Sequence, residues 1–341
     1  MRKIVYIGFT FEHHKGTHAG YQQIKNYLKY DYIIDCQKFQ DKGHKPVSEI
    51  SWFAKKKRIL YNRLFHIPAL PWYIIKVIIL GLFYNDLTFH FIYGENLYFK
   101  FIRRIVRKGN IIVCTYHQPL EWFKSEKREL ARLKSVDRII LVGNTEIEDF
   151  KKIVGHKNVF YIPHGICSDF YRPDKTIKKN HMLLTVGNWL RDYDFANDVY
   201  QELLKMDAQL EINVVCNENL QKKIIPSDRI HLLNGISDEQ LKELYCKCSI
   251  LFLPLIRYTA NNSLLEAGAT GCNILISSDY PDNSYISVDY INLIPMKLND
   301  TVLKVKNIIN RNYNENLSRF VHDNYSWSVV ALHTKDILLM I

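Results

Sequence analysis

The segment 250–278 constrains this chain most, because two short apolar runs in it flank a stretch that favours a helix. The runs at 250–253 and 274–276 are typical of buried strands. Between them, Ser263-Leu-Leu-Glu266 fits a capping box, which marks the start of a helix. A strand, loop, helix and strand in this order aim the helix N-terminus at the crevice above a parallel sheet. The free N–H groups and the positive dipole end there favour a phosphate group.

The side chains at the start of this helix indicate a ligand site. Asn261, Asn262 and Ser263 all offer hydrogen-bonding groups at the expected N-terminus. Glu266 follows one turn later. A carboxylate there can accept hydrogen bonds from sugar hydroxyls, repel a phosphate, or simply cap the helix, and spacing alone does not choose among these roles.

The length of 341 residues suggests two domains of ordinary size, and the order of the expected elements supports this division. The stretch 170–180 is polar and contains Pro173 and several lysines, so we expect it to link the domains. A new strand is expected at 181–186, where a second unit begins. The sequence therefore predicts the α/β class, with two successive units.

Positive charge is concentrated in the first half of the chain. Residues 1–165 hold 28 Lys and Arg against 14 Asp and Glu, whereas residues 166–341 hold 18 against 21. A basic half of this kind favours an anionic partner, either nucleic acid or an anionic membrane surface. No nucleic-acid-binding motif accompanies the charge, so we expect no nucleic acid partner.

The apolar run 67–84 lies in this basic half and carries Lys76. It is too short to span a bilayer, which takes about 20 apolar residues. It is either a buried core helix, which we favour, or an interfacial helix flanked by basic residues.

The first residues lack the apolar core of a signal peptide, and the seven cysteines show no metal-binding spacing. We therefore expect a cytoplasmic protein, with peripheral attachment to the inner face of the cell membrane as a further prediction.

The first half offers two candidate site elements, each following an expected strand. A loop with Gly16, His18 and Gly20 follows the strand 2–8, without the G-x-G-x-x-G pattern of dinucleotide sites. Either this loop contacts a substrate, or its glycines only permit a tight turn. His117 follows the strand 111–115, at a sheet edge where ligands of open α/β folds bind. It can handle a proton, hydrogen-bond a sugar hydroxyl, or be structural.

The second half adds a candidate phosphate site. Gly187 follows the strand 181–186, and Arg191 precedes a helix expected at 195–205. A glycine lets the backbone approach a ligand closely, and a guanidinium can bind a diphosphate through two hydrogen bonds. Asp192 and Asp194 superficially match a pair of metal ligands, but carboxylates also suit the first turn of a helix. We expect no metal ion.

In their order along the chain, these elements resemble the nucleotide-sugar-dependent glycosyltransferases of the GT-B fold, especially the large retaining family 4. The resemblance covers most of residues 160–330 and its motifs are specific. It is carried by the blocks 162–170 with Pro173, 185–187 with Arg191, 237–241 with Tyr245, 253–271, and 325–327. The first half fits less strictly, through the loop 16–20 and His117.

The resemblance implies two facing Rossmann-like domains with a central cleft. Residues 1–168, completed by a C-terminal helix at 326–341, would form the acceptor domain. Residues 169–325 would form the domain that binds the nucleotide sugar.

The resemblance also implies roles for the candidate residues. Glu266 would bind the ribose hydroxyls, and His117 would lie near the donor sugar, so these two form the expected catalytic pair. The remaining donor-binding residues would be Gly187, Arg191, Asn261, Asn262, Ser263 and Leu264. The loop with Gly16, His18 and Gly20 would lie near the diphosphate or the acceptor.

Three positions depart from the family pattern. Tyr258 stands eight residues before Glu266, where the family usually has a second Glu that contacts the donor sugar. No Lys evidently follows Arg191 to share the phosphate, and His164 stands where Asn is common. Tyr258 therefore joins the donor-binding residues, and it bears on which sugar is transferred and on whether one is transferred at all.

We therefore expect a metal-independent transferase of the hexosyltransferase type. It would move a sugar, with retention, from a nucleoside diphosphate sugar to an acceptor hydroxyl in cell-envelope polysaccharide, lipopolysaccharide or capsule assembly. Its expected partners are that donor, a glycan or lipid-linked acceptor and an anionic membrane surface. The alternatives are a GT-B-fold nucleotide-binding protein without transfer activity and a GT-B sugar-nucleotide epimerase.

Overall fold

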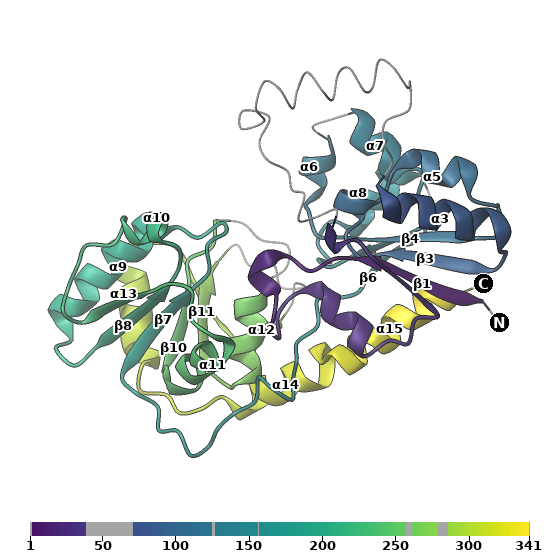
Figure 1. Ribbon diagram of the computed structural model, residues 1–341. Helices are drawn as coiled ribbons and strands as arrows, with labels where there is room; N and C mark the ends of the chain where they lie inside the picture. Colours follow the sequence, from purple (N-terminus) through teal and green to yellow (C-terminus); the bar gives the residue numbers. More distant parts are fainter. Residues whose placement is uncertain are drawn as a thin grey trace, which may run out of the picture.

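The computed structural model describes residues 2–38, 71–124, 127–155, 157–256, 261–278 and 286–340. These ranges form two α/β domains, each built on a six-stranded sheet (Figure 1). The first sheet has the strand order β2-β1-β3-β4-β5-β6, and the second has the order β12-β11-β10-β7-β8-β9. Every pairing in both sheets is parallel, as the expected alternation of strands and helices requires.

The first domain takes its strands from apolar runs that helices cover on both faces. Its strands are β1 (Lys3–Gly8), β2 (Tyr32–Asp35), β3 (Leu87–Phe91), β4 (Ile111–Tyr116), β5 (Arg138–Leu141) and β6 (Val159–Tyr161). Its helices are η1 (Glu12–His14), η2 (Tyr21–Asn26), α3 (Trp72–Phe83), α4 (Gly94–Leu97), α5 (Lys100–Ile105), α6 (Leu120–Lys124), α7 (Lys127–Leu133) and α8 (Ile147–Val154). Every residue of β3 and β5 is buried, as expected for central strands of a covered parallel sheet.

The second domain repeats this architecture. Its strands are β7 (Met182–Val186), β8 (Glu211–Val215), β9 (Ile230–Leu233), β10 (Ile250–Leu253), β11 (Asn273–Ser277) and β12 (Asn292–Ile294). Its helices are α9 (Tyr193–Met206), α10 (Glu218–Gln221), α11 (Asp238–Lys247), α12 (Asn262–Ala269), α13 (Leu298–Ile308) and α14 (Glu315–Tyr325). The strand order reverses at β7, which lies between β10 and β8, so a ligand crevice is expected beyond the carboxyl ends of β7 and β10.

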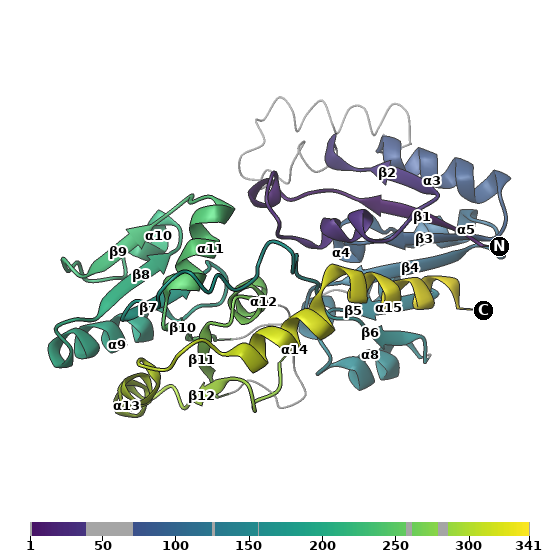
Figure 2. The same cartoon turned by 90° about the horizontal axis from the view of Figure 1, so that it is seen from below.

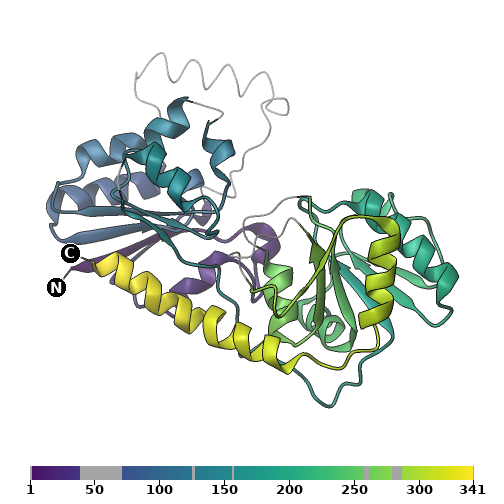
Figure 3. The same cartoon turned by 180° about the vertical axis from the view of Figure 1, so that it is seen from behind.

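The last helix, α15 (Trp327–Leu339), returns to the first domain. Figures 2 and 3 show α14 and α15 running in succession from the second domain to the first sheet. Trp327 is buried in the first core, where it lies so close to Gly165 that a Cβ there would meet its ring at 2.4 Å. Arg138 of β5 donates hydrogen bonds of 2.8 and 2.6 Å to the carbonyl oxygens of Ile337 and Met340. The C-terminal helix therefore ties the two domains together.

After the loop with Gly16, His18 and Gly20, the chain forms the 3-10 helix η2, Tyr21–Asn26. Tyr21 and Ile24, three residues apart, fall on the same side of a 3-10 helix, and both are buried.

Helix α3 is only partly the buried core helix that we favoured. Tyr73, Ile74 and Val77 pack into the core, whereas Trp72 and Phe83 are 68% and 73% exposed. Its apolar residues occur on all sides, so packing one face leaves the other in solvent. None of the helices in the described ranges is long and apolar enough to cross a membrane.

Candidate active site

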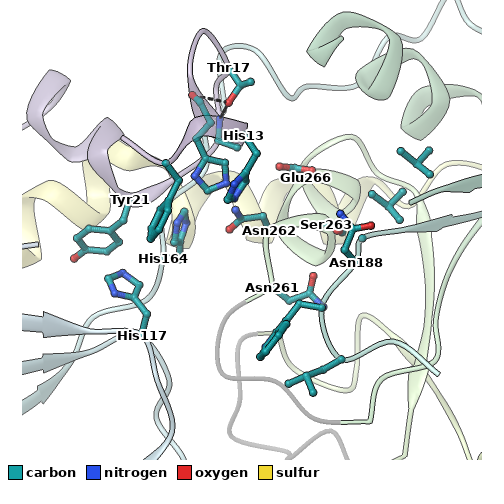
Figure 4. Close-up of a pocket in the computed structure, with 18 of the residues that line it drawn as sticks. His13, Thr17, Tyr21, His117, His164, Asn188, Asn261, Asn262, Ser263 and Glu266 are labelled. Atoms are coloured by element: carbon teal, nitrogen blue, oxygen red, sulfur yellow. Dashed lines mark hydrogen bonds between the residues drawn. The ribbon is translucent and has the colours of Figure 1, made fainter. Parts of the chain in front are cut away.

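A cavity of about 820 Å³ lies between the two domains. Its walls come from the loops after β1, β3 and β4 on one side and from the loops after β7 and β9 with the start of α12 on the other. Figure 4 shows His117, Tyr21 and His13 of the first domain facing Asn261 and Glu266 of the second. The carboxyl ends of both sheets thus meet at one site, and ligands of open α/β sheets bind beyond such ends.

The N-terminus of α12 forms one wall of the cavity, but its cap differs from the expected capping box. Asn261 is the N-cap, with φ −141°, and its side chain accepts a hydrogen bond of 3.3 Å from the Leu264 backbone N–H. Ser263 lies inside the first turn, and it lines the cavity together with Asn262. Leu264 is fully buried and is not among the lining residues, so its side chain faces the core.

Glu266 is not the helix cap, because Asn261 holds that position and the Glu266 carboxylate bonds to Tyr245. The residue is 4% exposed and lines the cavity, and its Oε2 accepts a hydrogen bond of 2.9 Å from the Tyr245 hydroxyl. The pKa of Glu266 is raised to about 7, mainly by burial; the Tyr245 hydrogen bond opposes this shift and the charge of Asp238 adds to it. A buried carboxylate beside a cavity can accept hydrogen bonds from ligand hydroxyls.

Arg191 and Gly187 adjoin the start of α12. Gly187 has φ +114°, a conformation that favours glycine, and a Cβ there would meet the Arg191 guanidinium at 2.8 Å. Arg191 donates to the carbonyl oxygens of Val186 and Trp189 at 3.2 and 2.7 Å and to Asn261 Oδ1 at 3.3 Å. Burial lowers the pKa of this guanidinium. The three acceptors fix a positive charge at the N-terminal end of α12, which suits an anionic group.

The glycine loop of the first domain reaches across to the second. Gly16 and Gly20 have φ of +74° and +93°, and Thr17 and Ala19 line the cavity, whereas Gly16 and His18 do not. Asp238 Oδ2 accepts a hydrogen bond of 2.5 Å from the His18 backbone N–H and lies 2.9 Å from its ring Nδ1. The His18 ring stacks on Phe170 with centroids 3.7 Å apart. His18 is therefore a contact between the domains.

His117 lines the cavity at the end of β4, as its place in the sequence predicts. Its ring meets Tyr21 edge-on at 5.0 Å and lies 4.8 Å from the ring of Tyr93. The His117 backbone N–H donates a hydrogen bond of 3.2 Å to Glu95 Oε1. The same oxygen lies 3.3 Å from Nδ1 of the His117 ring. His164 also lines the cavity, and burial lowers its pKa to about 3, so its imidazole is neutral.

Several lining residues were missed by the sequence analysis, and Tyr258 falls outside the described residues. Glu95 could have been found by the rule that found His117, because it follows the end of β3. Trp122, Asn188, Trp189, Asn234 and Gly235 also line the cavity, and no motif distinguishes them in the sequence. Across the ranges that the structure covers, no group of three or more His, Cys, Asp or Glu is arranged to hold a metal ion.

Solved structures that share this architecture identify the fold. Sucrose-phosphate synthase from Thermosynechococcus elongatus superposes with a TM-score of 0.66 over 98% of both chains, at 14% identity. Anabaena HepE in complex with UDP and glucose superposes with a TM-score of 0.67 over the whole of both chains, at 10% identity. A trehalose-phosphate synthase from Burkholderia xenovorans in complex with glucose-6-phosphate superposes with a TM-score of 0.65 at 10% identity. The superposition covers 98% of this chain and 99% of the synthase.

The chain therefore has the GT-B fold, with two facing Rossmann-like domains and a central cleft. At identities of 10 to 14% these likenesses define the fold and leave the activity to be argued from the site. No protein-family model matches the chain, and no curated protein matches it by sequence.

Proposed function

We propose that this protein is a glycosyltransferase that moves a sugar from a nucleoside diphosphate sugar to an acceptor hydroxyl. The observation that carries the proposal is the joint position of Glu266, Arg191 and the α12 N-terminus on one wall of the cavity between the domains. A carboxylate for ribose hydroxyls beside a fixed cation and a helix N-terminus matches the polar groups of a nucleoside diphosphate. Residues 169–325 form the donor domain in this proposal, and residues 1–168 with 326–341 form the acceptor domain.

In the proposed reaction, the leaving diphosphate gains negative charge as the bond from its oxygen to the sugar breaks. Arg191 and the backbone N–H groups at Asn262 and Ser263 stabilise that charge, so no metal ion is needed. Gly187 lets the backbone after β7 pass close to the Arg191 guanidinium. His117 faces the donor sugar from the other wall and contacts one of its hydroxyls. The resemblance to family 4 supports hexosyl transfer with retention, and two matched structures that contain UDP and glucose or UDP-glucose support UDP-glucose as the first donor to test.

Membrane attachment is a separate part of the proposal, supported by the outer face of α3. Trp72, Ile79, Leu82 and Phe83 are exposed apolar side chains on this helix. The exposed basic residues nearby are Lys76 on α3, Arg104 on α5, and Arg107 and Lys108 after α5. The Arg107 backbone N–H donates a hydrogen bond to the Gly81 carbonyl oxygen of α3, so the two segments are adjacent. Basic side chains contribute roughly 1 kcal/mol each at an anionic lipid surface. A lipid-linked or glycan acceptor in cell-envelope assembly would then be met at the inner face of the membrane.

Two alternatives retain the donor site. A nucleotide-binding protein without transfer activity is supported by Tyr258, which replaces the Glu common in the family. A sugar-nucleotide epimerase would use the same donor groups but would form product without any acceptor.

A donor panel tests the proposal. Purified protein is incubated with UDP-, GDP-, ADP- and dTDP-sugars, and nucleotide release is measured with and without mixed glycan acceptors, for the wild type, Arg191→Ala and the exposed control Lys205→Ala. We expect one nucleotide class to bind and turn over, with binding at least tenfold weaker in Arg191→Ala and unchanged in the control. No turnover with any donor, together with no effect of Arg191→Ala on nucleotide binding, contradicts the proposal.

A further inference from the structure

The part of the cavity wall that the first domain supplies is aromatic and mostly uncharged. Its described members are Phe11, His13, His14, Thr17, Ala19, Tyr21, Tyr93, Glu95, Asn96, His117, Gln118, Pro119, Trp122 and His164. Among these described residues there is no lysine or arginine, although this half of the chain holds 28 of them. The lysines and arginines of the first domain whose positions the structure describes therefore lie outside this wall of the cavity.

Three histidines of this wall, His13, His14 and His164, do not replace the missing cations. Burial lowers the pKa of His14 to about 4, with the neighbouring His13 adding to the effect, and burial lowers the pKa of His164 to about 3. The pKa of His13 is lowered as well, also by burial. All three imidazoles are therefore mainly neutral at pH 7 and cannot neutralise a phosphate group.

Glu95 is the one carboxylate that the first domain contributes to the described wall. Its side chain is only 6% exposed, and its Oε1 accepts the His117 backbone N–H at 3.2 Å. Its Oε2 is buried and has no hydrogen-bond partner within the part of the chain that the structure describes. Leaving a buried carboxylate oxygen unpaired is costly. Because Glu95 lines the cavity, a small turn of its side chain that brought this oxygen to a ligand hydroxyl would satisfy it.

The nearest arginine does not cancel this preference. Arg132 donates a hydrogen bond of 2.9 Å to the Glu95 backbone carbonyl, but its guanidinium forms an ion pair with Glu129. Arg132 is not among the lining residues. A molecule in this part of the cavity therefore meets the Glu95 carboxylate and not the Arg132 cation.

The aromatic side chains of this wall suit the C–H faces of a sugar, whereas Glu95 suits its hydroxyl groups. The Tyr93 ring lies 5.0 Å from Phe11 and 4.8 Å from His117, so these rings form one continuous apolar patch on the wall. Trp122 lines the same side and is 43% exposed, which leaves its ring accessible. Apolar rings with a few hydrogen-bonding groups among them suit a ligand that has C–H faces and hydroxyl edges.

We propose that the first-domain side of the cavity binds an uncharged saccharide as acceptor, with one of its hydroxyls donating a hydrogen bond to Glu95, and that it rejects phosphorylated sugars. This inference rests on the proposed glycosyltransferase function and names its acceptor class. A sugar phosphate would bring two negative charges to a described wall that holds a carboxylate and no permanent cation. The similar trehalose-phosphate synthase structure is a complex with glucose-6-phosphate, so fold likeness alone would not suggest this preference.

Direct binding measurements test the inference without requiring turnover. Saturation-transfer NMR is recorded on the full-length protein with UDP present, using methyl α-D-glucopyranoside, methyl β-D-galactopyranoside and maltose as neutral probes. Glucose-6-phosphate and fructose-6-phosphate are the anionic probes. We expect at least one neutral probe to bind at least tenfold more tightly than either sugar phosphate. A preference for a sugar phosphate overturns the inference, as does the absence of binding by all five probes to a protein that binds UDP.

Variants test the part played by Glu95. Glu95→Gln keeps the shape of the side chain but removes its charge, and Glu148→Gln changes an exposed carboxylate on α8 as the matched control. We expect Glu95→Gln to weaken binding of the neutral probe at least tenfold, to reduce discrimination against sugar phosphates and to leave UDP affinity within twofold. Unchanged probe affinity in a folded Glu95→Gln protein overturns the role of Glu95. A protein that binds UDP and neutral sugars but transfers nothing would instead contradict the proposed function, so the two failures are distinguishable.

Discussion

If the proposed function is correct, Glu266 makes the affinity for the donor depend on pH. A carboxylate accepts two hydrogen bonds from ribose hydroxyls best when it is ionised, whereas burial raises its pKa to about 7 in the free protein. Donor binding therefore favours the ionised form and lowers the pKa of Glu266. Below pH 7 the protein must release a proton when the donor binds, so affinity increases as pH rises through 7.

The size of the effect follows from the fraction of ionised Glu266. With a pKa of about 7, only about one molecule in ten is ionised at pH 6, whereas about nine in ten are ionised at pH 8. The Kd for the donor should therefore be roughly tenfold higher at pH 6 than at pH 8, equivalent to about 1.4 kcal/mol. UDP-glucose is the appropriate probe because its diphosphate does not titrate in this range, unlike the terminal phosphate of UDP.

Isothermal titration calorimetry with UDP-glucose between pH 5.5 and 8.5 measures this dependence. Repeating the titration at pH 6 in two buffers of different ionisation enthalpy counts the protons released, and we expect close to one. Glu266→Gln should bind at least tenfold more weakly at pH 8 and should show little dependence on pH. Glu243→Gln, at an exposed carboxylate paired with Lys247, should behave as the wild type. The reasoning is refuted if Glu266→Gln retains the wild-type slope, or if wild-type affinity falls as pH rises.

Four further outcomes are expected. The pKa of Glu266 is higher folded than unfolded, so its stabilising contribution of about 3 kcal/mol is present below about pH 4.5 and lost as pH rises through 7. Urea unfolding should therefore show Glu266→Gln gaining stability relative to the wild type between pH 5 and 8. Trp327→Ala should cost about 3–5 kcal/mol in the same assay, because this large side chain is buried in the core of the first domain. Gly271→Ala should cost at least about 1 kcal/mol, because Gly271 has φ +72° and its Cβ would meet the Tyr313 ring at 1.8 Å. Phe83→Glu on α3 should reduce sedimentation with anionic liposomes at low salt several-fold, and a wild type that ignores such liposomes contradicts the membrane proposal.

The sequence was sufficient to predict the parallel sheets and several of the residues that line the cavity. Uninterrupted apolar runs mark strands that are buried on both faces, and the run 250–253 is β10 as expected. Residues that follow such strands must lie at the carboxyl edge of the sheet, which is why His117 and Gly187 could be placed at the cavity.

The details of the site depend on contacts between distant parts of the chain. Ser263 and Glu266 have the spacing of a capping box, but Glu266 bonds to Tyr245, and Asn261 caps α12 instead. The contact of His18 with Asp238 joins residues 220 positions apart, and no local pattern announces it. The hydrogen bond from the His117 backbone N–H to Glu95 forms because β3 and β4 are neighbours in the sheet, and the sequence alone did not show that they are neighbours. Tyr258 lies outside the described residues, so its role stays a prediction.

A crystal structure with UDP-glucose bound tests the central claim most directly. We predict that the ribose hydroxyls lie within hydrogen-bonding distance of Glu266 and that the diphosphate contacts Arg191 and the backbone N–H groups at Asn262 and Ser263. The glucose should lie in the cavity between these groups and His117. A nucleotide bound outside this cavity, or bound in it with its ribose away from Glu266 and its diphosphate away from Arg191, would contradict the account.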